Sequence, residues 1–102
     1  MLVKELPIAI EREKIAAFCQ ERGIRKLSLF GSVLRHDFTP TSDIDVLVEY
    51  WPHRFPGWDL FLHAYELSQL VGKAVDLNLP TMLSPYFRDE VLREAVTIYE
   101  QT

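Results

Sequence analysis

The sequence has almost none of the features that mark secreted or membrane-spanning proteins. Cys19 is its only cysteine, so no intrachain disulfide can form, and its place beside Phe18 in a helical pattern predicts a buried side chain. No apolar stretch approaches the length of a membrane span, and the first residues contain no apolar signal-peptide segment. We therefore expect a cytoplasmic protein without a membrane anchor.

Basic residues are too few and too scattered for a protein that grips long DNA or RNA. The chain has 11 Lys and Arg against 15 Asp and Glu, a formal net charge of -4, and no basic run longer than the pair Arg25-Lys26. Binding to a nucleic-acid backbone normally requires a basic face. We therefore exclude long nucleic acid as a partner, whereas a nucleotide held through metal cations is compatible with this charge.

The apolar pattern predicts one small α/β domain over residues 1–102. Helices are expected over 11–22, over 58–71 and from Ser84-Pro85 to about residue 93, with Gly23 and Gly72 ending the first two.

Strands are expected between these helices. Their ranges are 24–30, 44–50, 74–79 and a short final segment over 96–99. A helical turn is expected over 33–36 and a loop over 50–57. The resulting order, α-β-α-β-α-β-α-(β), predicts a small mixed sheet flanked by helices.

Two aspartates near the start of the second strand are the first candidates for chemistry. Alternate side chains of a strand share a face, so Asp43 and Asp45 point one way and Ile44 and Val46 the other. Two carboxylates this close repel each other unless a cation lies between them. Among cations, carboxylate oxygens favour Mg²⁺ or Mn²⁺. Taken alone, the pair is equally compatible with a solvated strand face.

A second candidate is the pair Gly31-Ser32, which follows the first predicted strand. A glycine there lets the backbone approach a ligand closely. Free backbone N–H groups and the Ser32 hydroxyl at the start of a helical turn form an anion site suited to phosphate. Arg35 lies three residues after Ser32 on the same side of that turn and could hold a phosphate oxygen.

Together these features resemble a known signature. Gly31-Ser32, ten further residues and then Asp43-x-Asp45 resemble the nucleotidyltransferase superfamily that includes DNA polymerase beta. The fuller motif, 31–35 and 42–48, is similar to the minimal nucleotidyltransferases of bacteria and archaea. The resemblance implies a polymerase-beta-type core and a nucleotide-binding set of Gly31, Ser32, Arg35 and Ser42.

The resemblance also implies a third carboxylate on a neighbouring strand, a place that Asp76 fits because it alternates with apolar residues over 75–79. In this family Asp43, Asp45 and Asp76 would be the metal ligands and catalytic residues. The implied reaction transfers a nucleoside monophosphate from a nucleoside triphosphate to an acceptor hydroxyl, with Asp76 helping to deprotonate that hydroxyl.

Proteins of this kind resemble the antitoxin half of HEPN–MNT toxin–antitoxin pairs. The resemblance implies that ATP is the substrate and that AMP is transferred to a tyrosine of a HEPN-type ribonuclease toxin. Two alternatives stay open. One is a binding protein that neutralises a partner without turnover, and the other is a homo-oligomeric nucleotidyltransferase acting on a small molecule.

The remaining polar and aromatic candidates have weaker interpretations. His36, His53 and His63 share no metal-ligand spacing with the aspartates, so we do not expect them to be ligands. The aromatic segment 50–58 is compatible with packing against the core and with a surface that contacts a partner.

Overall fold

A four-stranded sheet organises the part of the chain that the structure describes. The structure is a computed structural model, and it describes residues 11–34, 39 and 43–101. The strands are β1 (Ile24–Phe30), β2 (Ile44–Tyr50), β3 (Val75–Asn78) and β4 (Val96–Glu100). Their order is β3-β2-β1-β4, with β1 antiparallel to both β2 and β4 and with β2 parallel to β3. The predicted mixed sheet is confirmed.

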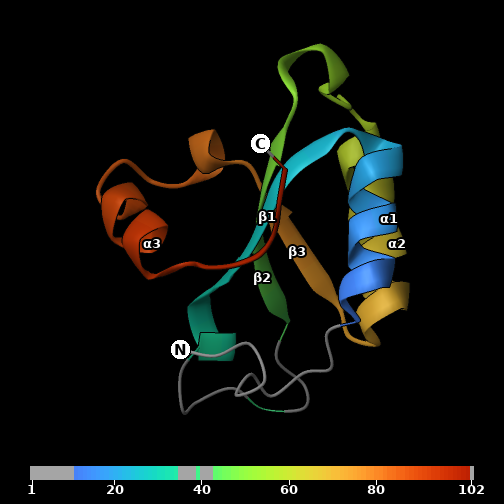
Figure 1. The fold of residues 1–102 in the computed structure, drawn as a ribbon. Helices are drawn as coiled ribbons and strands as arrows, with labels where there is room; N and C mark the ends of the chain where they lie inside the picture. Colours follow the sequence, from blue (N-terminus) through green and yellow to red (C-terminus); the bar gives the residue numbers. More distant parts are fainter. Residues whose placement is uncertain (1–10, 35–38, 40–42, 102) are drawn as a thin grey trace.

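Helices lie on both sides of this sheet. Figure 1 shows α1 (Arg12–Arg22) and α2 (Asp59–Val71) side by side on one side, and α3 (Arg88–Glu94) on the other. Three short 3-10 turns complete the described elements: η2 (Gly31–Leu34), η3 (Pro52–Arg54) and η4 (Pro80–Met82). Within these ranges, no helix combines the length and apolar character needed to cross a membrane.

The core lies between the sheet and the helices α1 and α2. The β2 residues Ile44, Val46 and Val48 alternate into it, as the strand period requires. From the helices, the buried side chains are Ile15, Phe18, Cys19, Leu60 and Leu67. The predicted burial of Cys19 is confirmed, and burial raises the pKa of its thiol to about 12.

The predicted start of the last helix at Ser84-Pro85 is wrong. The N–H groups of Phe87 and Arg88 both donate to the Ser84 carbonyl at 3.0 Å, and the Tyr86 N–H donates to Ser84 Oγ at 3.3 Å. The Ser84 side chain therefore caps a turn that leads directly into α3, which begins only at Arg88. The Arg88 side chain ties the segment before this turn to α3, because it donates to the carbonyls of Pro80 and Leu83 at 3.0 Å each.

A polar pair connects the end of β2 to helix α2. Tyr50 Oη lies 2.8 Å from His63 Nδ1, and both side chains are half-buried. Burial, together with the nearby Arg22 guanidinium, lowers the pKa of His63. The neutral imidazole is therefore favoured in the folded state, and its Nδ1 can accept the tyrosine proton.

This pair predicts a pH dependence of stability. Because folding lowers the pKa of His63, its contribution is fully present above the unfolded pKa of about 6.5 and is lost as the pH falls through the folded value. We expect the free energy of unfolding of the wild type to fall more than that of His63→Gln between about pH 7.5 and 5.5. Urea titrations across that range measure the difference. Parallel curves for the two proteins would contradict the role given to His63.

Candidate functional site

Three neighbouring strands bring the predicted acidic residues and the glycine turn together. Asp45 on β2 is the backbone partner of Asp76 on β3, and on its other side it is the partner of Phe30 on β1. Adjacent strands lie about 4.8 Å apart, and directly paired residues project from the same face. The two carboxylates therefore belong to one row across the sheet, with the turn η2 at the end of that row.

Gly31 is required at the start of this turn. Its φ is +77°, a value that L side chains rarely adopt, and a Cβ added there would overlap Asp45 Oδ2. The sequence indicated that a ligand would approach the backbone here. In the structure, the group in closest approach is the Asp45 carboxylate, so the glycine turn and the acidic pair form one unit.

The other predicted residues surround this unit or fall outside the described ranges. Asp43 is exposed and immediately precedes β2, where the Ile44 N–H donates to the Ala74 carbonyl at 2.9 Å. Ser32 is half-buried in η2, which the buried Val33 anchors to the core.

The metal and phosphate assignments are only partly covered by the described residues. Arg35 and Ser42 lie outside them. Within them, no three His, Cys, Asp or Glu side chains converge closely enough to form a metal site from protein ligands alone. Asp45 and Asp76 remain as a pair on adjacent strands.

Farther along the same sheet face, acidic charge is neutralised. Glu49 lies on the Asp45 side of β2, and its Oε1 accepts a hydrogen bond from Arg25 Nη2 at 2.7 Å. Ser28 Oγ and Thr97 Oγ1, on β1 and β4, lie 3.4 Å apart. The acidic residues Asp45 and Asp76 are thus followed by a mixed polar surface.

The histidines and the aromatic segment occupy varied environments. His63 bonds to Tyr50, His53 is exposed in η3, and His36 lies outside the described ranges. Within the aromatic segment, Trp58 is 86% exposed and Phe55 is 60% exposed, whereas Trp51 is half-buried. The segment is therefore partly packed and partly presented to solvent.

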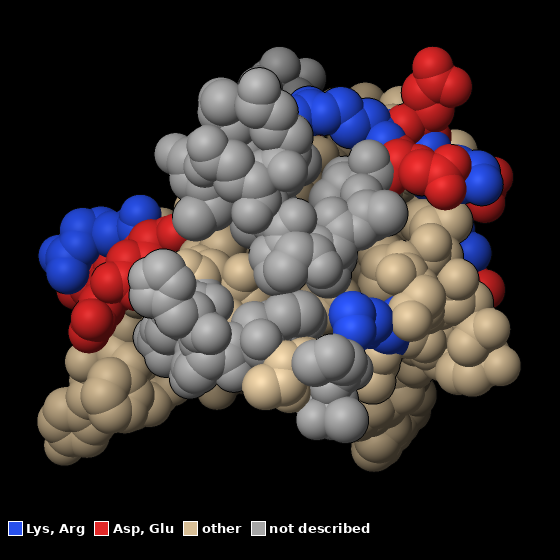
Figure 2. All heavy atoms as spheres, turned by 90° about the horizontal axis from the view of Figure 1, so that it is seen from below, with Lys and Arg blue, Asp and Glu red and all other residues tan. Residues whose placement is uncertain are grey.

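The end of the molecule that carries η2 and the start of β2 has no uniformly basic surface. Figure 2 shows Lys and Arg side chains interspersed with Asp and Glu side chains toward its rim, and the described residues form no continuous basic patch there. This distribution agrees with the net charge of -4 and differs from the face expected of a protein that binds long nucleic acid.

Comparison with known sequences identifies a family and named relatives. The family profile described as "Polymerase beta, Nucleotidyltransferase" matches residues 13–102. A protein of Methanocaldococcus jannaschii, provisionally named a protein adenylyltransferase, is 36% identical over 87 residues, which are 85% of this chain and 92% of that protein. The protein adenylyltransferase MntA of Thermococcus cleftensis is 34% identical over 77 residues, covering 74% of this chain and 76% of its own length.

Comparison with solved structures gives the same fold. A structure provisionally described as a minimal nucleotidyltransferase has 34% identity and a TM-score of 0.68, with 83% of this chain and 86% of that chain covered. A more distant match, with 20% identity and a TM-score of 0.62, covers 88% of this chain and 70% of a chain in a complex. That complex is described as a tri-AMPylated Shewanella oneidensis HEPN toxin with an MNT antitoxin.

Proposed function

Because the chain belongs to the polymerase beta nucleotidyltransferase family, we propose that it transfers AMP from ATP to a hydroxyl group of a HEPN-type ribonuclease toxin, a tyrosine hydroxyl in particular, and so acts as its antitoxin. The observation that carries this proposal is the pairing of Asp45 with Asp76 beside the Gly31 turn. The naming of two relatives as protein adenylyltransferases supports a protein acceptor.

The carboxylates fit a divalent cation bound together with the nucleotide. Mg²⁺ is usually held by one or two carboxylates plus oxygens of the substrate phosphates, so Asp45 and Asp76 suffice without a third convergent protein ligand. Asp43, at the entrance to β2, would be the additional ligand. When bound, Mg²⁺ or Mn²⁺ would neutralise the charge that develops on the phosphates during displacement.

The remaining residues would position the nucleotide and move one proton. Gly31 and Ser32 would hold the outer phosphates through backbone N–H groups and the Ser32 hydroxyl, with Arg35 and Ser42 completing the set. The acceptor oxygen would attack the α-phosphorus, and the bond from that phosphorus to the leaving pyrophosphate would break. Asp76 would accept the proton that the hydroxyl loses.

An apolar surface on helix α2 favours a protein acceptor over a small molecule. Trp58, Phe61 and Tyr65 are 86%, 67% and 63% exposed. The Trp58 and Phe61 rings stack, with centroids 6.2 Å apart. Together with Leu62, these residues lie at helical spacing along one side of α2. Contiguous exposed apolar groups usually mark protein contacts.

Incubation with ATP, Mg²⁺ and the protein encoded by the adjacent gene tests the proposal. Intact-mass spectrometry should detect one or more added AMP groups on that protein, and peptide mapping should place them on a hydroxyl side chain. Inhibition of the partner without any mass change would identify a binding protein instead. Transfer only to small hydroxyl compounds would identify the homo-oligomeric alternative.

Substitution of Gly31 tests the link between the turn and the acidic pair. Gly31→Ala and Gly72→Ala should each cost about 1–2 kcal/mol of stability, because both positions have positive φ. Only the Cβ at position 31 would displace Asp45, since position 72 has open space around it. We expect transfer to fall about 100-fold in Gly31→Ala alone, as measured by initial rates at equal folded concentration. Equal transfer rates in Gly31→Ala and Gly72→Ala would show that catalysis does not depend on the Gly31 turn.

A further inference from the structure

Strand β3 pairs with only the first part of β2. The parallel register joins residues Ile44–Leu47 of β2 to Val75–Asn78 of β3 and stops there. The next hydrogen bond of a parallel ladder would run from the N–H of residue 80 to the carbonyl of Val48. Residue 80 is Pro80, which has no N–H and starts the turn η4. The second half of β2 therefore has an open edge.

The backbone groups on this edge are directed away from β1. The Ile44 N–H donates to Ala74 beside β3, whereas the Trp51 N–H donates to Gly23 on the β1 side at 2.9 Å. Alternation along the strand then places the Val48 carbonyl and both backbone groups of Tyr50 on the β3 side. Among the hydrogen bonds of the described residues, none reaches these three groups.

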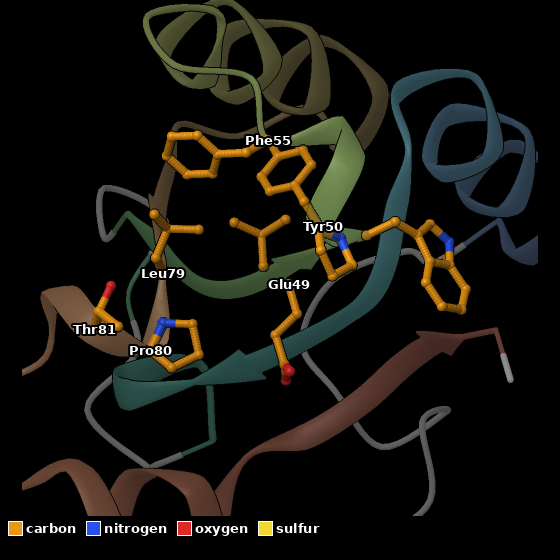
Figure 3. A pocket seen from close by; sticks show the side chains of 9 residues that line it. Glu49, Tyr50, Phe55, Leu79, Pro80 and Thr81 are labelled. Atoms are coloured by element: carbon orange, nitrogen blue, oxygen red, sulfur yellow. The ribbon is translucent and has the colours of Figure 1, made fainter.

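A groove of about 390 Å³ runs along this open edge. Phe55 and Tyr50 form one wall, with their rings edge to face and their centroids 6.4 Å apart. Leu79 and Pro80 form the opposite end. Figure 3 shows these side chains around the strand, with Glu49 on the other side of the strand from Phe55. The groove thus combines apolar walls with one backbone N–H donor and two carbonyl acceptors that no hydrogen bond of the described residues uses.

We infer that this groove binds an extended segment of the acceptor protein, which adds to β2 as a strand where β3 ends. This inference rests on the proposed function. The segment would donate an N–H to the Val48 carbonyl, bond to both backbone groups of Tyr50 and place an apolar side chain against Phe55 and Leu79. Main-chain bonds would supply affinity, and the apolar side chain would supply selectivity.

The position and charge of the groove favour the acceptor over a second copy of this chain. Although Arg25 pairs with the Glu49 carboxylate, two copies paired edge to edge about Glu49 would still place identical carboxylates opposite each other, which is unfavourable. A partner segment without an acidic residue at that position avoids this repulsion. Pro80 lies four residues beyond Asp76, a span of about 13 Å along a strand. A segment bound here would hold its protein within reach of the transfer site.

Phe55→Arg and Phe87→Arg form a matched pair for the test. Both side chains are exposed, at 60% and 61%, but only Phe55 lines the groove. With the adjacent-gene protein as acceptor, Phe55→Arg should raise the KM for acceptor about tenfold and leave kcat and the KM for ATP unchanged. Phe87→Arg should change none of the three. In the wild type, the same acceptor should slow hydrogen exchange at the Tyr50 amide.

Each outcome separates this inference from the proposed function. Unchanged KM in Phe55→Arg, with equally fast Tyr50 exchange in free and bound protein, would overturn the groove assignment while transfer itself stands. A raised KM in Phe87→Arg alone would assign docking to the start of helix α3 and also overturn it. If the wild type transfers no AMP, the proposed function fails. Slowed Tyr50 exchange in that case would still support the groove as a docking site for the partner.

Discussion

Replacing Asp76 by asparagine is expected to lower the rate of AMP transfer by about 10²–10⁴-fold, the usual effect of removing a positioned base. Asp76 is on β3, one strand away from Asp45, and in the proposed reaction it would accept the proton that the acceptor hydroxyl loses. Asp43 and Asp45 would remain to hold the nucleotide-bound cation. ATP affinity should therefore change much less than the rate.

Single-turnover mass spectrometry gives the rate of the Asp76→Asn variant, and calorimetry with Mg²⁺ and ATP gives its affinity. Asp59→Asn is a suitable control, because Asp59 is also an exposed aspartate but starts helix α2. A variant that loses ATP binding and transfer to the same degree would make Asp76 chiefly a metal ligand. Full activity of Asp76→Asn would remove it from the site altogether.

The strands were the most predictable part of the fold. The alternation of Ile44, Val46 and Val48 with Asp45 predicted β2 with its observed bounds, because one buried face imposes a period of two. The adjacency of Asp45 and Asp76 was different. It depends on the parallel register of β2 and β3 across helix α2, a long-range pairing that no local pattern encodes. Only the family resemblance placed Asp76 beside the other aspartates.

Features decided by tertiary contacts were missed. Ser84-Pro85 is a local helix-start signal, but Ser84 accepts the hydrogen bonds of a turn that precedes α3, and the Arg88 side chain binds the carbonyls of Pro80 and Leu83 just before it. Leu79-Pro80 follows the last residue of β3. The sequence did not indicate that a β3 of this length would leave the second half of β2 without a strand partner. On α2, Leu60 and Leu67 are buried. A second apolar stripe, which includes Phe61 and Tyr65, faces solvent, and no periodicity of the sequence distinguishes it from core.

The double substitution Asp43→Asn/Asp45→Asn should abolish Mg²⁺-dependent ATP binding. Loss of residues that merely orient metal ligands typically weakens metal binding about 10–100-fold, so replacement of two ligands should weaken the Mg²⁺–ATP complex by at least about 100-fold. Both residues lie at the entrance to β2, away from the main core, although Asp45 contacts the Gly31 turn. Melting curves of the variant should accompany calorimetry to confirm that it is folded.

Without the metal ion, the double substitution should no longer weaken ATP binding. ATP and the two carboxylates are all negatively charged, so without a cation they repel one another. In EDTA, the double variant should therefore bind ATP at least as well as the wild type, and in Mg²⁺ it should bind far more weakly. A variant damaged in its fold would lose affinity under both conditions. Equal affinity of the two proteins in Mg²⁺ would show that the cation and its nucleotide bind elsewhere.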